Sequence, residues 1–159
     1  MFSHYQSILP KILVGHQLES SFSENNSFQL WSGFMPKRNL IPNRFDENYY
    51  SVQLFKDGID YFTDLNAKYT KWAAVQVKSS LDKPEGFDLL TIPAGEYAVF
   101  IHKGTSQDFI KTSQYIYGEW LPKSKYKLAS RPHFEILGSK YKLNDPNSEE
   151  EVWIPIQSK

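Results

Sequence analysis

The pattern of hydrophobic and polar residues changes its period near Gly104. Before this glycine, Tyr97–Ile101 is rich in the aromatic and β-branched residues of strands, and the turn residues Pro93–Gly95 separate it from a strand that begins at Leu89. After the glycine, mainly apolar residues recur at the spacing of a helix. These residues are Phe109, Ile110, Ser113, Ile116, Tyr117, Trp120 and Leu121. The pattern therefore predicts two strands followed by one helix.

Sequence signals also predict both ends of this helix and two further strands. Thr105 and Asp108 resemble a capping box, so we expect the helix to begin there. Pro122 is expected to end it, because proline disfavours helical backbone in the preceding residue and has no N–H to donate. Two short strands, His133–Gly138 and Glu151–Gln157, complete a strand–helix–strand–strand unit.

The first half of the chain shows a looser version of the same order. Lys11–Glu19 has the composition of a strand, and Ser23 has the side chain of an N-cap for a helix that Pro36 would stop. Tyr49–Lys56 and Trp72–Lys78 are predicted as strands. The residues expected on the inner face of the helix are Phe28, Leu30, Trp31, Phe34 and Met35.

The two halves therefore read as repeats of one unit. His16 and His102 close equivalent predicted strands, and the members of this pair are 86 residues apart. Pro36 and Pro122 close equivalent predicted helices with the same separation. Such a repeat predicts a pseudo-dimer within one chain, with a groove where the halves meet.

The predicted fold class is α+β. Two pseudo-symmetric strand–helix–strand–strand repeats form an antiparallel sheet, with two main helices on one side and a central groove. Residues 1–159 are expected to form a single domain, with repeat one at about 8–80, repeat two at about 87–158 and Ser79–Phe87 as the link between them.

Composition and charge exclude several classes of function. Eighteen basic and eighteen acidic residues cancel, so the chain lacks the basic surface that attracts duplex DNA or an anionic membrane. The absence of cysteine excludes disulfides, thiolate nucleophiles and cysteine-bound zinc. The four histidines have no metal-ligand spacing and there is no glycine-rich phosphate loop, so we expect no cofactor and no metal. Without a signal peptide or a long apolar run, we expect a soluble cytoplasmic protein that binds neither nucleic acid nor membranes directly.

Aromatic residues are unusually frequent, and four Trp, ten Tyr and eleven Phe make up 16% of the chain. They could form the core. They could also line a binding site, where the apolar body and the polar tip of Tyr and Trp are both useful. Composition alone leaves both interpretations open.

Glu135 interrupts an apolar strand, between Phe134 and Ile136. Alternation along a strand offers one interpretation, in which Glu135 faces water. In the other, its carboxylate faces the groove between the repeats. Aromatic walls would make that carboxylate costly to desolvate, and a cationic ligand would restore the missing countercharge.

Several segments of the chain resemble one known family. The segments "LTIPAGEYAVFIHKG", "IYGEWLP", "HFE" and "EEEVWIPI" are similar, in this order, to the second half of the GyrI-like effector-binding domain. This small-molecule-binding module is found fused to AraC- and MerR-type regulators and also on its own. The segment "ILVGHQLESSFSENNSFQLWSGFMP" resembles the family's first repeat. The resemblance implies two strand–helix–strand–strand units around a central groove.

The resemblance also implies a set of ligand-binding residues. In GyrI-like domains the glutamate of the "FE" segment meets the positive charge of bound ligands, and Glu135 matches it. The aromatic walls expected for the groove are Trp31, Phe34, Tyr117 and Trp120 on the two helices, and Tyr50 and Trp72 on strands of the first half. Each of these rings could instead belong to the core.

The leading hypothesis is a stand-alone domain, without a DNA-binding domain, that binds amphipathic, cationic or planar aromatic small molecules. Some GyrI-like proteins hydrolyse cyclopropanoid compounds, so the resemblance leaves open an enzyme in which Glu135 is the general acid or base. Some stand-alone relatives inhibit DNA gyrase, which leaves open a protein partner. We favour binding without turnover.

Overall fold

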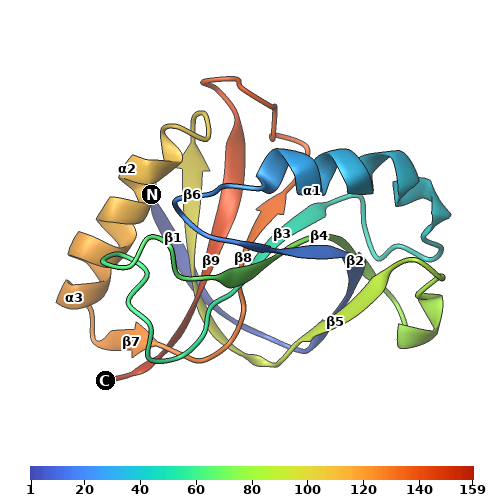
Figure 1. Cartoon of the computed structure of the whole chain (residues 1–159). Coiled ribbons are helices and arrows are strands. Elements are labelled where there is room, and N and C mark those ends of the chain that lie inside the picture. The colour runs from blue at the N-terminus through green and yellow to red at the C-terminus, as the bar shows by residue number, and fades with distance from the viewer.

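Strands from both halves of the chain join one antiparallel sheet in the computed structural model, which describes residues 1–159 (Figure 1). The strands are β1 (Phe2–Ile8), β2 (Lys11–Ser20), β3 (Tyr49–Leu54), β4 (Tyr69–Val77), β5 (Asp88–Ile92), β6 (Gly95–Lys103), β7 (Tyr126–Leu128), β8 (His133–Leu137) and β9 (Glu149–Ser158). The helices are α1 (Ser27–Phe34), α2 (Phe109–Tyr115) and α3 (Leu121–Lys123), with the 3₁₀ turns η1 (Met35–Leu40) and η2 (Ser80–Asp82) and the π-helical turn η3 (Ile116–Trp120). The fold class is therefore α+β, as predicted.

The two repeats lie side by side in the sheet. Its strand order is β1-β6-β9-β8-β3-β4-β2-β5, with β7 paired to β9. Repeat one contributes β3-β4-β2 and repeat two contributes β8-β9-β6, so the central strands β3 and β8 join the repeats. The strands that precede the repeats are exchanged, because β1 pairs with β6 and β5 pairs with β2. The order confirms two strand–helix–strand–strand repeats about an axis between β3 and β8.

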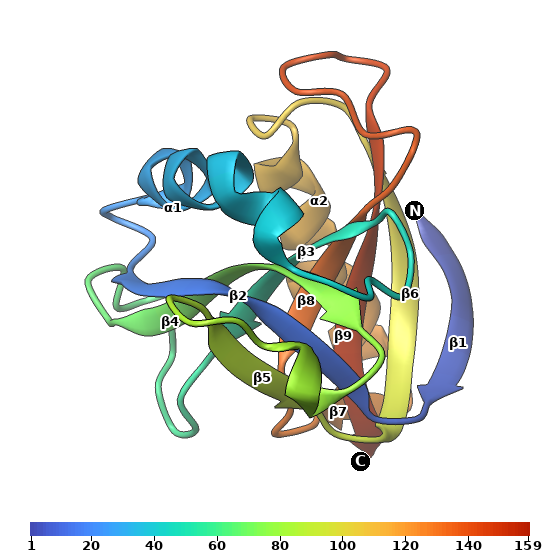
Figure 2. The same ribbon diagram turned by 90° about the vertical axis from the view of Figure 1, so that its right-hand side faces the viewer.

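Two short links make the sheet curve. Leu9–Pro10 joins β1 to β2, and Pro93–Ala94 joins β5 to β6, although each link connects strands near opposite edges of the sheet. Such a link spans only roughly 10 Å, so the two edges meet at this end of the curved sheet (Figure 2). The concave face of the curved sheet encloses one hydrophobic core. Its buried residues are Ile8, Leu13, Tyr50, Val52, Trp72, Ala74, Ile92, Tyr97, Val99, Phe134 and Trp153.

Both main helices pack on the other face of the sheet. Directly paired residues of antiparallel strands point to the same face, which places Ala73, Ser51, Glu135 and Val152 in one row across β4, β3, β8 and β9. Ala73 packs in the cluster under α1, and Val152 packs in the cluster under η3. The helical segments therefore share one face, as predicted, and Ser51 and Glu135 lie between them.

Both helical segments continue past the prolines predicted to end them. Pro36 lies in the first turn of η1 and Pro122 lies in the first turn of α3, where a missing N–H costs little. The α-helix α1 nevertheless ends at Phe34, before Pro36 as predicted, and only a 3₁₀ turn continues to Leu40; the second segment ends at Lys123, one residue past the predicted end. The predicted N-cap is wrong, because α1 begins after Asn26 rather than at Ser23.

The contacts before α2 follow the predicted capping box. The N–H of Thr105 donates to Oδ2 of Asp108 at 2.9 Å, and the N–H of Asp108 donates to Oγ1 of Thr105 at 3.4 Å. The regular helix begins at the next residue, Phe109. No helix of the protein is both long enough and apolar enough to cross a membrane.

Two strands have no counterpart in the sequence prediction. β1 is exposed along nearly its whole length, so it lacks the alternation of a half-buried strand. β7 has only three residues. The start of β4 also differs, because its pairing with β2 begins at Tyr69 rather than at Trp72.

Burial along the strands gives the register between the two repeats. Tyr69–Val77 of β4 and Ser148–Ile156 of repeat two can be aligned position by position. The order of buried and partly buried residues is then the same at every position but one. Pairing of β3 with β4 and of β8 with β9 then makes Ser51 the equivalent of Glu135. Because these two residues also pair with each other, the pseudo-twofold axis passes between them.

The predicted equivalence of His16 with His102 is wrong by two residues. Following the paired residues across the sheet from Ser51 leads to His16 on β2. Following them from the equivalent position in repeat two leads to Phe100 on β6, so Phe100 is the counterpart of His16. The ring of His102 is instead buried against Thr112 of α2, with Nδ1 2.7 Å from the threonine hydroxyl. The two histidines therefore do not mark equivalent strand ends.

Candidate functional site

Glu135 lies at the centre of the face that carries the helices, directly opposite Ser51. Gln53 donates from Nε2 to Oε1 of Glu135 at 3.3 Å. The only ion pair within 4.0 Å in the chain is Lys68–Glu24, on the surface. The Glu135 carboxylate therefore has one amide donor and no cationic partner in contact.

Burial controls the charge of the groups around this point. It raises the pKa of Glu135 above the ordinary value for glutamate, and the negative charge of Glu150 raises it further, against the opposing effects of Lys71 and Gln53. Burial likewise raises the pKa of Glu150 and lowers the pKa of Lys71. All three ionisable groups are thus held where their charged forms are disfavoured.

A hydrogen-bonded pair of rings lies near Glu135 on the same face. The hydroxyl of Tyr117, on η3, lies 3.0 Å from Nδ1 of His133. Burial lowers the pKa of His133 to about 4, so its ring is neutral at physiological pH. Burial, and secondarily the charge of Glu135, raises the pKa of Tyr117. His133 and Glu135 are two residues apart on β8 and so point to the same face.

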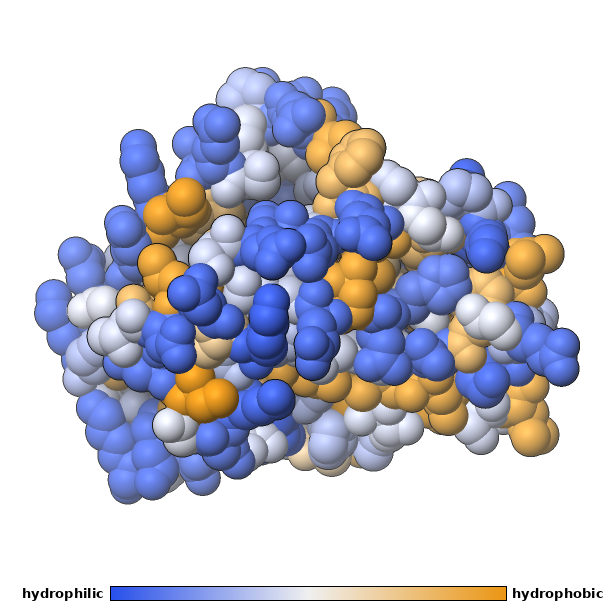
Figure 3. All heavy atoms as spheres, viewed as in Figure 1, coloured by the Kyte–Doolittle hydropathy of each residue, from blue (hydrophilic) through white to orange (hydrophobic).

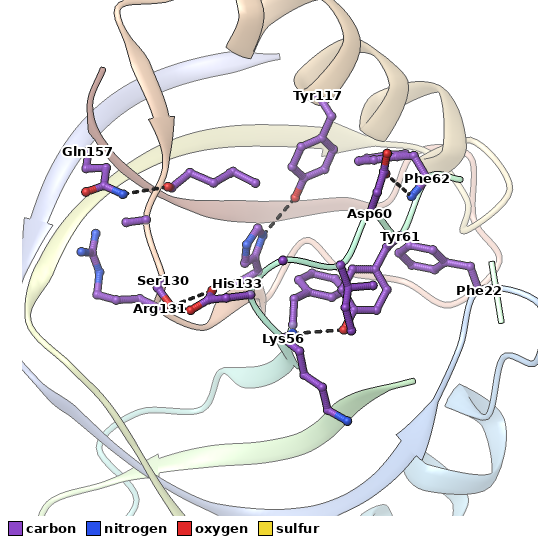
Figure 4. A pocket seen from close by; sticks show the side chains of 16 residues that line it. Phe22, Lys56, Asp60, Tyr61, Phe62, Tyr117, Ser130, Arg131, His133 and Gln157 are labelled. Atoms are coloured by element: carbon purple, nitrogen blue, oxygen red, sulfur yellow. Dashed lines mark hydrogen bonds between the residues drawn. The ribbon is translucent and has the colours of Figure 1, made fainter. Parts of the chain in front are cut away.

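A cavity of about 700 Å³ opens beside this pair (Figure 4). Tyr117 and His133 form one wall, and the segment between β3 and β4 forms much of the rest. Its aromatic lining residues are Phe22, Phe55, Tyr61, Phe62 and Tyr117. The volume is in the range of small-molecule sites. Glu135 does not line the cavity itself but lies two residues beyond His133 on the same face of β8.

Rings of the β3–β4 segment contact the hydrogen-bonded pair. The ring centroid of Phe62 lies 5.3 Å from that of Tyr117, and the centroid of Phe55 lies 4.9 Å from that of His133. Phe62 is 59% exposed, whereas Phe55 packs on further aromatic rings. Phe62 therefore forms the rim of the cavity and Phe55 its inner wall.

The α1 side of the same face carries a second aromatic pair. The rings of Trp31 and Tyr49 meet edge to face with centroids 6.2 Å apart. Tyr49 pairs with Leu137 of β8 and so points to the same face as Glu135. In the register between the repeats, Tyr49 is the equivalent of His133. Aromatic pairs therefore flank the Glu135 position on both the α1 side and the η3 side.

The structure brings only part of the predicted set of ligand-binding residues together. Glu135, Tyr117 and Trp31 lie on the face between the helices. Phe34 is fully buried in the core under α1. Trp120 lies toward the edge of the sheet, where it stacks on Phe2 of β1 with ring centroids 5.3 Å apart.

Tyr50 and Trp72 lie outside the groove, contrary to the prediction. Both belong to the core on the opposite face, with 1% and 3% of their surface exposed. The Tyr50 hydroxyl donates to Oε1 of Gln76 at 3.1 Å, and the indole N–H of Trp72 has no partner. Their chain neighbours Tyr49 and Lys71 point toward the helices instead, because successive residues of a strand point to opposite faces.

Several residues of this site were missed by the sequence analysis. Phe55 and Phe62 lie in a segment without regular structure, and the density of aromatic residues there is a signal that could have identified them. Gln53, Lys71 and His133 gave no signal, because a polar residue in a strand more often faces water.

The comparisons with known proteins agree with this architecture. Residues 7–157 match the GyrI-like small molecule binding domain. The transcriptional regulator BrlR of Pseudomonas aeruginosa is 28% identical over 146 residues, which cover 91% of this chain and 51% of that protein. A DNA gyrase inhibitor of Erwinia billingiae is 33% identical over 89 residues, which cover 52% of this chain and 54% of that protein. The chain thus spans about half the length of these two curated relatives.

Solved structures share the fold at low sequence identity. SAV2435 bound to tetraphenylphosphonium superposes with a TM-score of 0.72 and 17% identity, covering 99% of this chain and 94% of that one. The EcmrR C-terminal domain superposes with a TM-score of 0.69 and 14% identity, covering 98% and 97%. A hydrolase from Listeria innocua superposes with a TM-score of 0.60 and 9% identity, covering 97% and 91%. On the family match, which spans nearly all of its length, the chain belongs to the GyrI-like small molecule binding domain family.

Proposed function

We propose that this domain binds amphipathic small molecules that carry a positive charge and a planar aromatic group, with Glu135 as the partner of the charge. The observation that carries the proposal is the Glu135 carboxylate, which has a raised pKa, one amide donor and no cation within 4.0 Å. An ionised carboxylate in such surroundings is costly unless it is paired. A cationic ligand supplies the missing charge.

The aromatic surroundings support the same class of ligand. Tyr117 and His133 link the Glu135 position to a cavity walled by phenylalanine and tyrosine rings. Flat aromatic walls bury the rings of a ligand, and each ring face adds cation–π attraction of about 0.5–2 kcal/mol. The related fold of SAV2435 binds tetraphenylphosphonium, a cation that carries four phenyl rings.

The outer surface supports a small ligand rather than an extended apolar docking face. On the side shown in Figure 3, apolar side chains occur in separate groups among polar ones. The cavity, by contrast, gathers five aromatic rings in one place. Apolar ligand surface is therefore best buried inside the cavity.

Titration of a Glu135→Gln variant with a cationic and a neutral dye tests the proposal. The variant keeps the volume of the side chain and removes its charge, so rhodamine 123, a cation, should bind roughly ten- to a hundredfold more weakly. Nile red, which is neutral and planar, should lose much less. Glu151→Gln is the matched control, because Glu151 pairs with Ile136 and so lies on the opposite face of the sheet. Equal small losses for both dyes in Glu135→Gln would refute the assignment of Glu135.

A second candidate function is hydrolysis of a reactive small molecule such as a cyclopropanoid compound. One observation favours it, because a glutamate with a raised pKa can deliver a proton as a general acid. The buried hydroxyl of Tyr117 lies close enough for the charge of Glu135 to affect its pKa. Formation of a ring-opened product by the wild-type protein, abolished in Glu135→Gln, would establish this function. Binding of the compound without product would reject it.

A further inference from the structure

The two repeats carry opposite charges at equivalent positions. In the register that matches Ser51 with Glu135, Lys71 of β4 corresponds to Glu150 of β9. Lys71 pairs with Gln53 in the β3–β4 ladder, so it points to the same face as Glu135. The groove is therefore not symmetric in charge, because repeat one places an ammonium where repeat two places a carboxylate.

Lys71 has no carboxylate in contact. Its Nζ donates to Oγ of Ser27, the first residue of α1, and no acidic side chain lies within 4.0 Å. An ammonium has three N–H donors, so one neutral hydroxyl leaves it under-satisfied. Burial lowers the pKa of Lys71, while Glu135 and Glu150 act in the opposite direction. By contrast, Lys68, just before the same strand, is 48% exposed and reaches Glu24 at 3.8 Å.

Gln53 contacts Glu135 and is the direct ladder neighbour of Lys71. Its side-chain amide donates to Oε1 of Glu135. Glu135 thus takes a hydrogen bond from a neutral amide, and no ion pair within 4.0 Å joins it to Lys71. The face between the helices therefore holds an amino group and a carboxyl group that form no ion pair with each other.

We infer that Lys71 binds an anionic group of the ligand, so that the groove selects zwitterionic amphipathic molecules over purely cationic molecules of the same shape. This inference rests on the proposed function, in which Glu135 takes the cationic group. A zwitterion pairs both groups of the protein at once. A simple cation pairs only Glu135 and brings a second positive charge toward Lys71, where low dielectric makes repulsion larger than in water.

Rhodamine 110 and rhodamine 123 are a suitable pair of probes. They share one planar cationic ring system, and rhodamine 110 carries a free carboxylate where rhodamine 123 carries a methyl ester. The first is thus a zwitterion and the second a cation of nearly the same shape. Fluorescence titration of the wild-type protein should show rhodamine 110 bound roughly tenfold more tightly, the effect of one charge-assisted contact.

Substitution of Lys71 should remove this preference and leave cation binding in place. Lys71→Met should weaken rhodamine 110 roughly ten- to a hundredfold and leave rhodamine 123 unchanged or tighter. Lys71→Arg, which keeps the charge, should retain most of the preference for rhodamine 110. Lys78→Met is the matched control, because Lys78 is exposed just beyond the end of β4. It should change neither affinity.

The outcomes separate this inference from the proposed function. Two results would overturn the role of Lys71: a wild-type protein that binds rhodamine 123 more tightly, or a Lys71→Met variant in which the affinities for both dyes change equally. If the affinities for both dyes still depend on Glu135, the proposed function stands. Failure of both dyes to bind the folded wild-type protein would overturn the proposed function together with the inference. A preference for rhodamine 110 that disappears only in Lys71→Met supports both.

Discussion

Ser51 and Glu135 face each other across the β3–β8 ladder and occupy equivalent positions in the two repeats. One carboxylate therefore stands beside the pseudo-twofold axis, where two identical repeats would carry either two carboxylates or none. A second carboxylate at that distance would repel the first and raise its pKa. The difference between serine and glutamate leaves a single carboxyl group in the β3–β8 pair at the axis.

Cation affinity should rise with pH. Burial and the charge of Glu150 raise the pKa of Glu135, so the protonated acid persists to a higher pH than in an exposed glutamate. A cation binds the ionised form, hence binding releases a proton and affinity increases as pH rises through that pKa, by up to about tenfold per pH unit. Rhodamine 123 titrations between about pH 6 and pH 9 measure the slope.

Glu135→Gln supplies the control for this slope. The variant has no proton to release at this position. Only the smaller contribution of Glu150 to the pH dependence of the affinity should therefore remain. A wild-type affinity that falls as pH rises would contradict the role of Glu135 as an ionising partner. A slope that persists unchanged in Glu135→Gln would assign the titration to another group.

Tyr50→Phe should affect stability without affecting ligand binding. The Tyr50 hydroxyl donates to Gln76 and accepts from Lys11 Nζ at 3.3 Å, in the core on the face opposite the helices. Its loss should lower the free energy of unfolding by about 1 kcal/mol, measured by urea denaturation. The affinity for rhodamine 123 should stay the same. A large loss of dye affinity at unchanged stability would instead show that Tyr50 belongs to the binding site.

Local signals predicted most of the fold because they act over a few residues. The turn at Pro93–Gly95 and the contacts of Thr105 with Asp108 lie where the pattern placed them. The strand β1 could not be predicted, because its residues are largely exposed and do not alternate between apolar and polar; it is held by backbone pairing with β6 and by contacts such as that of Phe2 with Trp120. The exchange of β1 and β5 between repeats is a tertiary property that no local pattern encodes.

The outward face of β4 could not be predicted from its own sequence pattern either. β4 is buried on both sides from Trp72 to Val77, so its residues there do not alternate between apolar and polar, whereas in β3 apolar Val52 and Leu54 alternate with polar Ser51 and Gln53. In β4 the pattern leaves Trp72 and Lys71 as equal candidates for the face that carries the helices, whereas in β3 it places Tyr50 with Val52 on the apolar face. In the structure, Tyr49 and Lys71 point to the face that carries the helices, and each lies one residue before the residue predicted there. For Glu135, the strand pattern left both water and the groove open and the family resemblance favoured the groove; the structure places its side chain on the face between the helices.

Phe62→Ala should weaken ligand binding with little effect on stability. Phe62 is 59% exposed and contacts Tyr117 at the rim of the cavity. Substitution of so exposed a side chain should change the free energy of unfolding by less than about 0.5 kcal/mol. The loss of one ring contact should weaken dye binding roughly two- to tenfold. Phe28→Ala is the matched control, since Phe28 is 86% exposed and does not line the cavity.

Moving the carboxylate across the axis should preserve cation binding. Directly paired side chains of an antiparallel ladder have Cβ atoms about 5 Å apart, so a glutamate at position 51 would reach the same space from the other repeat. The amide of Gln53 serves both positions, because its Nε2 lies 3.4 Å from Oγ of Ser51 and 3.3 Å from Oε1 of Glu135. The neighbour of Ser51 on β4 is the small residue Ala73, which leaves room for the longer side chain.

Glu135→Ser alone should lose roughly ten- to a hundredfold in affinity for rhodamine 123. The double variant Ser51→Glu, Glu135→Ser should regain most of that loss, since the charge and its amide donor are both restored. Thermal melts of the three proteins establish that each is folded. The folded double variant could instead bind the cation no better than Glu135→Ser. Binding would then require the carboxylate on β8 itself, and the prediction that the two equivalent positions are interchangeable would be wrong.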